Sequence, residues 1–414
     1  RARARYHSTV VAGVSGALAQ TALQFVFLPY EAWISLSAIL TALWRMAVSH
    51  RNLLSWVTAA DAESRSRGGV LDAFLRMWPA LLPCLMAGIL SPHPAGAALA
   101  LVWMLSPLVA AGVSRQKKPG TEALTSEERR FLLRCAGDIW RFFETFLRPE
   151  DHFLPPDNYQ EQPAVGVAHR TSPTNIGLAL LACLAAVDLG LCRKEKALSL
   201  IAQTLATVER LPKWNGHLYN WYDTATLTVL PPAYVSSVDS GNFAGCLIAL
   251  REGLLEYGAL DLAERANALL KAISFEPLYD KKRRLFYIGV DVDKGAPTPG
   301  WYDLLASEAR QTSYIAVARG EVPRKHWRSL GRALVEKDGY RGLASWTGTM
   351  FEYLMPELLL PCYPNSLIYE SLKFCLSVQK KQAGSRPWGM SESAYYAYDH
   401  TLSYRYKAHG AAPL

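Results

Sequence analysis

The sequence predicts an all-α protein, a helical toroid preceded by transmembrane helices. Apolar residues gather in the first part of the 414-residue chain, where Ala95–Val113 runs for about nineteen residues without a charge, long enough to cross a bilayer core. Beyond residue 119, apolar residues recur at helical spacing in segments separated by long loops. Strands and helices do not alternate, so a parallel-sheet enzyme is not expected.

Residues 1–118 form the predicted membrane region. Val10–Tyr30 is mostly apolar, and three interpretations stay open for it: a membrane span, an interfacial helix or a core helix. Phe74–Leu90 and Ala95–Val113 flank a break at Ser91–Pro94, which predicts a hairpin of two spans near 73–113. The alternative is a buried hairpin of a soluble protein, and the long uncharged second run argues against it.

Charge predicts the orientation of this hairpin. No Lys or Arg lies in its turn. The basic residues that flank it on the two sides are Arg65, Arg67, Arg115, Lys117 and Lys118. Under the positive-inside rule, both ends then face the cytoplasm. The net charge is +8, but no Lys/Arg block with interleaved aromatics occurs, so nucleic-acid binding is not expected.

The seven cysteines have neither CxxC nor metal-ligand spacing, which predicts free thiols and no metal site. The chain opens with RARARYHSTVVAG, without an initiator Met or the layout of a signal peptide. We therefore expect it to be a piece of a longer protein.

Residues 119–414 have the composition of a soluble domain. Thr125 and Glu128 have the spacing of a capping box, which begins a helix to about Leu147. A short β-like patch covers Arg284–Asp291. Apolar periodicity predicts further helices at about 175–189, 194–209, 241–257, 260–274, 303–319, 323–334, 347–357 and 366–381.

The most distinctive stretch is Trp214–Gly245, which combines aromatic rings with aspartate, asparagine and histidine side chains. Sugars need carboxylate and carboxamide partners for their hydroxyls and aromatic faces for their C–H surfaces. The stretch therefore favours a sugar site. The structural alternative is an irregular loop held together by its aromatics.

Three later stretches share this character, and each contains one glutamate: Glu308, Glu352 and Glu392. A glycosidase needs two carboxyls, one to protonate the leaving oxygen and one to act as nucleophile or to activate water. Any single glutamate is more often a helix cap or an ion-pair partner, and Glu308 lies two residues from Arg310. Three such stretches, each with a tryptophan, favour catalysis.

The motifs in these stretches resemble the central, glycoamylase-like domain of bacterial cyclic β-1,2-glucan synthases. Two earlier segments resemble the linker that follows the glycosyltransferase domain of those proteins, Phe27–Trp33 and Leu54–Ala62. The motifs that carry the resemblance are Thr171–Gly177, His217–Asp223, Pro231–Val235, Val238–Asn242, Tyr302–Arg310, Gly348–Pro356 and Pro387–Tyr395.

The resemblance implies an (α/α)6 toroid over 119–414, incomplete at its C-terminal end, which cyclises linear β-1,2-glucan by retaining transglycosylation. It implies Glu392 as nucleophile and Glu308 as acid/base, while Asp239 or Glu352 orients a sugar hydroxyl or completes the proton path. It implies no cofactor and no metal. The implied substrate-binding residues are Trp214, His217, Asn220, Trp221, Tyr222, Asp223, Tyr234, Asn242, Tyr302, Arg310, Trp346, Trp388 and Tyr395.

The resemblance also implies a bacterial inner-membrane protein whose catalytic domain faces the cytoplasm and is covalently linked to transferase and phosphorylase-like domains. This chain contains neither of those domains, so neither of their activities is expected of it. Two alternatives stay open, an endo-β-1,2-glucanase-type hydrolase and a non-catalytic glucan-binding module.

Overall fold

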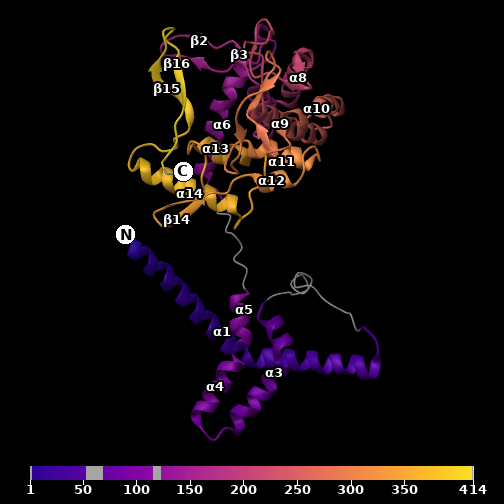
Figure 1. The fold of residues 1–414 in the computed structure, drawn as a ribbon, viewed down its shortest axis with the longest axis vertical. Helices are drawn as coiled ribbons and strands as arrows, with labels where there is room; N and C mark the ends of the chain where they lie inside the picture. The colour runs from indigo at the N-terminus through magenta and orange to yellow at the C-terminus, as the bar shows by residue number, and fades with distance from the viewer. Residues whose placement is uncertain (1, 53–68, 115–122, 413) are drawn as a thin grey trace. The chain divides into compact units, whose positions relative to one another are not determined.

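The computed structural model describes residues 2–52, 69–114, 123–412 and 414. It divides the chain into two compact units, Arg1–Ala123 (unit 1) and Leu124–Leu414 (unit 2) (Figure 1). The basic flanks Arg65–Arg67 and Arg115–Lys118 and the segment Leu54–Ala62 lie outside the described residues.

Unit 1 is helical throughout the part that the structure describes. Its elements are α1 (Ala2–Trp44), the π-helix η1 (Arg45–Ser49), α3 (Val70–Leu90), α4 (Pro94–Met104) and α5 (Ser106–Val113). Three helical segments are long and apolar enough to cross a membrane: Ala17–Ser49, Val70–Leu90 and Pro94–Val113. Transmembrane helices are thus predicted from both the sequence and the helix lengths.

The second helix of the expected hairpin is interrupted. α4 ends at Met104, and α5 begins at Ser106 with Pro107 in its first turn, where the missing N–H costs nothing. The indole of Trp103 on α4 donates a hydrogen bond to the carbonyl of Phe25 on α1 at 3.1 Å. This bond ties the hairpin to the first helix.

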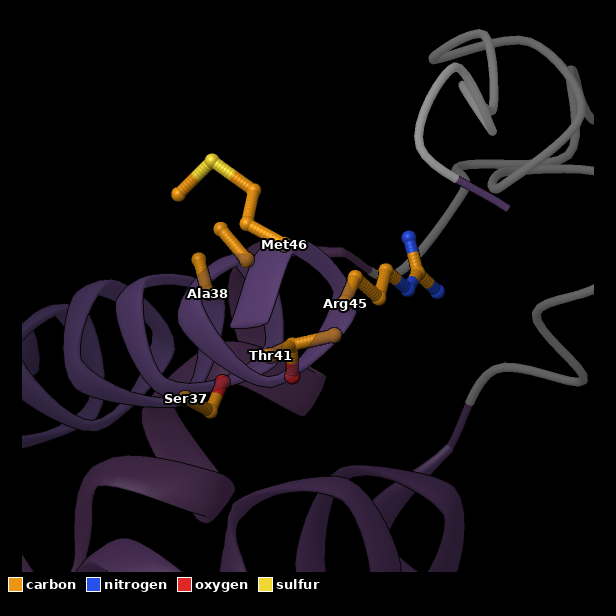
Figure 2. A pocket seen from close by; sticks show the side chains of 6 residues that line it. Ser37, Ala38, Thr41, Arg45 and Met46 are labelled. Carbon is orange, nitrogen blue, oxygen red and sulfur yellow. The ribbon is translucent and has the colours of Figure 1, made fainter. Parts of the chain in front are cut away.

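A hollow of about 350 Å³ lies along the end of α1 and η1 (Figure 2). It is lined mostly by small side chains, with Arg45 and Met46 at one end: Ser37, Ala38, Thr41, Ala42, Arg45 and Met46. None of these is acidic, so the hollow offers no carboxylate for chemistry.

Unit 2 begins with α6 (Ser126–Phe146), and the predicted capping box is confirmed. The Thr125 hydroxyl accepts a hydrogen bond from the backbone N–H of Glu128 at 3.2 Å. In return, the backbone N–H of Thr125 donates to Oε2 of Glu128 at 2.8 Å. The two bonds satisfy donors that a helix start otherwise leaves unpaired.

Helix α9 (Ser237–Glu256) is the centre of the larger core, because it packs against α7, α10 and α11. At Gly241 an added Cβ would lie 1.9 Å from Oγ1 of Thr312 on α11, so the missing side chain lets α9 and α11 approach closely. The neighbouring helices are α7 (Pro173–Asp188), α8 (Lys194–Arg210), α10 (Leu260–Ala272) and α11 (Arg310–Ala318).

A second, smaller core lies around α14 (Leu367–Ala383). Phe374 and Tyr353 are its largest fully buried side chains. Two shorter helices accompany it, α12 (Lys325–Ser329) and α13 (Met350–Leu354).

The connections between helices contain short antiparallel strands. β10 (Gly289–Asp291) pairs with β7 (Tyr234–Ser236) and β11 (Ala296–Pro297), and β9 (Leu285–Tyr287) pairs with β8 (Tyr279–Asp280) and β12 (Trp301–Tyr302). The other pairs are β1 (Tyr159–Gln160) with β2 (Gly166–Val167), β3 (Arg170–Thr171) with β6 (Tyr222–Asp223), β4 (Lys213–Trp214) with β5 (His217–Leu218), β13 (Leu334–Lys337) with β14 (Tyr340–Leu343), and β15 (Glu392–Tyr398) with β16 (Tyr404–Ala408).

Helix is the main element of the described chain, which confirms the all-α prediction, and the predicted patch at 284–291 becomes β9 and β10. Two expected helices are shorter than predicted, and the one expected at about 303–319 begins only at Arg310. The helix expected at about 323–334 ends at Ser329, and Leu334 already begins a strand. The hairpin β15–β16 was not expected. Its tip contacts the segment of β1 and β2 (Figure 1), where Tyr404 N–H donates to Gln160 Oε1 at 3.0 Å.

Candidate active site

Four acidic side chains come from four separate segments of unit 2. Asp239 lies in the first turn of α9, Glu308 in the turn before α11, Glu352 in α13, and Glu392 at the start of β15. The negative charges of the other three all raise the pKa of Glu308. The three sequence-predicted glutamates and Asp239 therefore belong to one neighbourhood.

Glu308 is the member of this group whose pKa is raised. The loss of hydration among surrounding protein atoms and the charges of Asp239 and Glu392 raise its pKa to about 8. A hydrogen bond from Asn242 acts in the opposite direction. Part of the side chain stays open to solvent. Glu308 is therefore a carboxyl that keeps its proton near neutral pH and can still meet a ligand.

Asp239 is held by hydrogen bonds at both oxygens. Thr174 Oγ1 donates to Oδ1 at 2.6 Å, and the amide nitrogen of Asn220 donates to Oδ2 at 3.1 Å. Its backbone N–H donates to the Ser236 hydroxyl, which caps α9, at 3.2 Å. The first turn of α7 and the segment between β5 and β6 thus fix this carboxylate.

Glu352 is 7% exposed and organises the loop that precedes α13. It forms a capping box with Thr349, whose hydroxyl and backbone N–H both donate to Oε2 at 3.1 Å. It also accepts hydrogen bonds from Ser345, Trp346 and Thr347. With so many donors on its two oxygens, Glu352 positions the loop that carries Trp346.

Glu392 begins the hairpin strand β15. The Tyr406 hydroxyl on β16 donates a hydrogen bond to its Oε2. The strand start is anchored from two sides, because Met390 N–H donates to Gln379 Oε1 at 2.7 Å and Phe351 N–H donates to Ser391 Oγ at 3.0 Å. Glu392 therefore comes from a segment fastened to α13 and α14.

Tyr302 and Trp346 form an aromatic pair close to Glu308. Their rings are stacked, with centroids 5.3 Å apart and an interplanar angle of 13°. The Trp346 indole donates to Asp303 Oδ1 at 2.9 Å, and 45% of the residue is exposed. Burial and then the charge of Glu308 raise the pKa of Tyr302. An exposed indole supported by a second ring offers a face for a sugar ring.

Other predicted binding residues in Trp214–Gly245 are core residues. His217 is fully buried, its Nε2 lies 2.6 Å from the carbonyl oxygen of Ser274, and burial lowers its pKa to about 4. Tyr222 is also fully buried and donates to the carbonyl of Pro212 at 2.6 Å. Trp214 packs against the larger core. These three side chains stabilise the loop.

Asn220 and Trp221 form a hydrogen-bonded pair beside Asp239. The Trp221 indole N–H donates to the Asn220 amide oxygen at 3.1 Å. One face of Trp221 is occupied, because the Arg170 guanidinium lies 5.1 Å from the ring centroid. Asp223 instead accepts the backbone N–H of Thr226 at 2.7 Å, which makes it a turn residue.

The remaining predicted binding residues divide between the site and other places. Tyr234 is near Asp239, whose charge contributes to raising its pKa after burial. Arg310 is 4% exposed and forms an ion pair with Glu357 at 2.6 Å, so it stabilises the core. Trp388 is 47% exposed beside Lys380, and Tyr395 donates to the Ser391 carbonyl at 3.2 Å.

Sequence reasoning missed Thr174 and Tyr406, which donate to Asp239 and Glu392, and the three hydroxyl residues that donate to Glu352, which are Ser345, Thr347 and Thr349. Thr174 lies within the motif Thr171–Gly177, but only the packing of α7 against α9 brings it to Asp239. Among the described residues, no group of three His, Cys, Asp or Glu side chains could hold a metal ion.

Unit 2 is a helical domain that brings together acidic side chains from four segments. The same fold occurs in the endo-β-1,2-glucanase of Chitinophaga pinensis in its sophorotriose and glucose complex (TM-score 0.55, 15% identity, 70% of this chain and 75% of that chain). It also occurs in the endo-β-1,2-glucanase of Talaromyces funiculosus in complex with sophorose (TM-score 0.56, 12% identity, 69% and 70%). At these identities the likeness concerns the fold alone.

In sequence, the chain is related to the cyclic β-(1,2)-glucan synthase NdvB of Rhizobium meliloti (strain 1021). The identity is 31% over an alignment of length 550, which covers 100% of this chain and 19% of that protein. The resemblance to cyclic β-1,2-glucan synthases is therefore confirmed along the whole chain, which spans about a fifth of that relative's length. No family model matches the chain.

Proposed function

We propose that residues 119–414 form a retaining transglycosylase that closes linear β-1,2-glucan into a ring. The observation that carries the proposal is Glu308, a part-buried carboxyl whose pKa is raised to about 8 by its surroundings and by the charges of Asp239 and Glu392. A retaining glycosidase needs one protonated and one ionised carboxyl at the scissile bond. Glu308 suits the acid/base. Glu392, at the start of β15, suits the nucleophile.

The proposed reaction has two displacements. A Glu392 oxygen attacks C1 of a glucosyl unit, the bond from C1 to O2 of the next unit breaks, and O2 takes the proton of Glu308. In the second step the free 2-hydroxyl at the far end of the same chain attacks C1, gives its proton to Glu308 and releases Glu392. Two inversions at C1 preserve the β-linkage. If water attacks instead, the product is a shortened linear glucan.

Asp239 and Glu352 have supporting roles in this proposal. Asp239 accepts two hydrogen bonds and lies near Glu308, which suits a carboxylate that orients a sugar hydroxyl. Glu352 holds the loop of Trp346, whose exposed ring we propose as a stacking face for glucose, together with Tyr302. Trp221 is proposed as a second contact through its remaining face.

The decisive experiment incubates the detergent-solubilised chain with linear β-1,2-glucan of one length. Transglycosylation gives rings, which are lighter than the linear chain of the same length by one water and have no reducing end. Hydrolysis gives new reducing ends, and a binding module gives affinity without turnover. Rings are the expected product, and either other outcome rejects cyclisation.

Two matched variants test the catalytic pair. Glu308→Gln and Glu392→Gln keep the side-chain shape but remove the proton or the nucleophile, so turnover should fall on the order of 10³-fold or more while the fold is retained. Glu370→Gln on α14 is the control, because Glu370 is half-exposed and pairs with Lys373 on the surface. Full activity in either site variant would assign its role to Asp239 or Glu352.

We further propose that residues 1–118 anchor the chain in a bacterial inner membrane, with the catalytic unit in the cytoplasm. The support is the three segments long and apolar enough to span a bilayer and the basic residues on both sides of the hairpin near 73–113. A reporter fused directly after Lys118 should be active as a cytoplasmic fusion. Periplasmic activity there would reject this orientation. Covalent linkage to transferase and phosphorylase-like domains is proposed on the basis of the longer relative.

A further inference from the structure

Gln379 and Met390 are joined by two hydrogen bonds. The Gln379 amide nitrogen donates to the Met390 carbonyl oxygen at 2.9 Å, and the Met390 backbone N–H donates to Gln379 Oε1 at 2.7 Å. A backbone N–H can only donate and a carbonyl oxygen can only accept, so these two bonds fix the orientation of the amide. Gln379 lies on α14 and is 0% exposed. A fully buried side chain thus holds both backbone groups of one residue.

This pair of bonds lies where the chain enters β15. Gly389, directly before Met390, has a φ of +113°. Because glycine can adopt many backbone conformations, the local sequence does not fix the direction in which the chain leaves Gly389. The Gln379 amide fixes it, since any other path would leave this buried amide without its partners. The Met390 carbonyl also accepts the backbone N–H of Met350 at 3.1 Å.

The fixed path determines where Glu392 lies, two residues beyond Met390 and at the start of β15. Ser391, between them, is held as well, because its Oγ accepts the backbone N–H of Phe351 at 3.0 Å. A displacement of Met390 would therefore be passed on to Glu392. A misplacement of about 1 Å in a reacting group can lower a rate about 10²-fold.

We propose that Gln379 is a positioning residue that places the Glu392 carboxylate by fixing the backbone of Met390. The proposal rests on the proposed function of Glu392 as the nucleophile. Gln379 is fully buried, so it cannot touch glucan and acts through Met390. Its loss should slow the attack on C1 and leave KM unchanged. The ratio of rings to hydrolysed chains should also stay the same, because both arise from one glycosyl-enzyme intermediate after the attack.

The test compares Gln379→Met with Gln379→Glu in the detergent-solubilised chain at pH 5. Methionine fills a similar space but has no N–H to donate, so kcat should fall about 10- to 100-fold while KM stays within about twofold. A buried glutamate keeps its proton at this pH and can donate and accept as the amide does, so Gln379→Glu should regain most of the parent kcat.

Gln203→Met on α8 is the matched control and should keep the parent kcat. The Gln203 amide also donates to a backbone carbonyl, that of Ser199 at 3.2 Å, but α8 carries none of the four acidic residues of the site. Urea unfolding gives the folded fraction of each variant, and kcat is expressed per folded chain. Parent kcat in Gln379→Met, equal losses in Gln379→Met and Gln379→Glu, or a larger share of hydrolysed product would overturn the proposal.

A second measurement does not depend on turnover. Hydrogen exchange followed by mass spectrometry should be faster in peptides that contain Met390 in Gln379→Met, because the Met390 N–H has lost its acceptor, and should be unchanged in Gln379→Glu. Parent exchange in Gln379→Met would also overturn the proposal. If the parent chain turns over no glucan, the proposed function fails, while hydrogen exchange still decides whether Gln379 fixes Met390.

Discussion

The Tyr406 hydroxyl on β16 donates a hydrogen bond to Glu392 on β15. The two residues are diagonal neighbours, since Tyr406 pairs with Ala394, two positions beyond Glu392. One carboxylate oxygen of Glu392 is thereby held, and in the proposed reaction the other attacks C1. The hairpin thus supplies both the proposed nucleophile and the group that positions it.

Tyr406→Phe tests this relationship. Without the hydroxyl, Glu392 samples orientations that miss C1, so kcat should fall about 10- to 100-fold while KM changes little. The measurement is steady-state turnover of linear β-1,2-glucan. Tyr340→Phe on the exposed hairpin β13–β14 is the matched control and should keep the parent rate. An unchanged kcat in Tyr406→Phe would mean that the hydrogen bond has no part in catalysis.

Glu308 should make the stability of the chain depend on pH. Its pKa is raised from 4.5 to about 8, so the unfolded state loses the proton first as the pH rises. Stability from this group is therefore full below about pH 4.5 and falls by about 1.4 kcal/mol per pH unit until about pH 8. Glu308→Gln should remove this slope and be most stabilising at alkaline pH.

The measurement for Glu308 is denaturant unfolding at pH 5 and pH 8 for the parent and Glu308→Gln. Glu370→Gln serves as the comparison, because Glu370 is half-exposed and pairs with Lys373 on the surface. Parallel pH dependence in the parent and Glu308→Gln would contradict the raised pKa.

Arg310 should contribute to stability and not to glucan binding. Arg310→Met leaves Glu357, 15% exposed, as an uncompensated buried charge, which should cost about 3–5 kcal/mol. The double variant Arg310→Met/Glu357→Leu should recover most of this loss. Urea unfolding measures the stabilities, and the folded fraction should bind glucan with the parent affinity. A weaker affinity at parent stability would instead return Arg310 to the binding site.

Gly241→Ala should separate the two helices that carry the site. The new Cβ would lie 1.9 Å from Oγ1 and 2.7 Å from Cα of Thr312, so the backbone of α11 must move away from α9. We expect a loss of about 1–3 kcal/mol in stability and about 10²-fold in turnover, because Asp239 and Glu308 move apart. Gly137→Ala on α6 is the control, since its Cβ meets only Leu191 Cδ2 at 3.9 Å. Parent activity in Gly241→Ala would show that the close approach is unnecessary.

The sequence predicts the helices well where apolar spacing is regular, as in α7, α8 and α10. Glu308 and Glu392 are predicted because glutamate among aromatic and small residues is chemically unusual. His217 and Tyr222 lie in an equally polar-aromatic stretch but are fully buried. Residue types alone do not separate a ligand-facing ring from a core ring, because both need apolar faces and a hydrogen-bonding partner.

The hairpin β15–β16 could not be predicted from local spacing. Its strands depend on contacts far along the chain, and its turn is organised by Asp399, which accepts the backbone N–H of Thr401 at 2.8 Å and of Ser403 at 3.0 Å. The contact of Thr174 with Asp239 could not be predicted either, because it joins two helices distant in sequence.

The fastening of the hairpin tip has a consequence for the order of events during synthesis. Gln160 donates to the carbonyl of Leu402 at 2.8 Å, across 242 residues, and accepts the backbone N–H of Tyr404. A ribosome delivers Gln160 and Glu308 long before the strand that carries Glu392. Under the proposed assignment, the nascent domain is inert while it assembles. It becomes competent to cut and rejoin glucan only when β15 and β16 reach the earlier segment that carries Gln160.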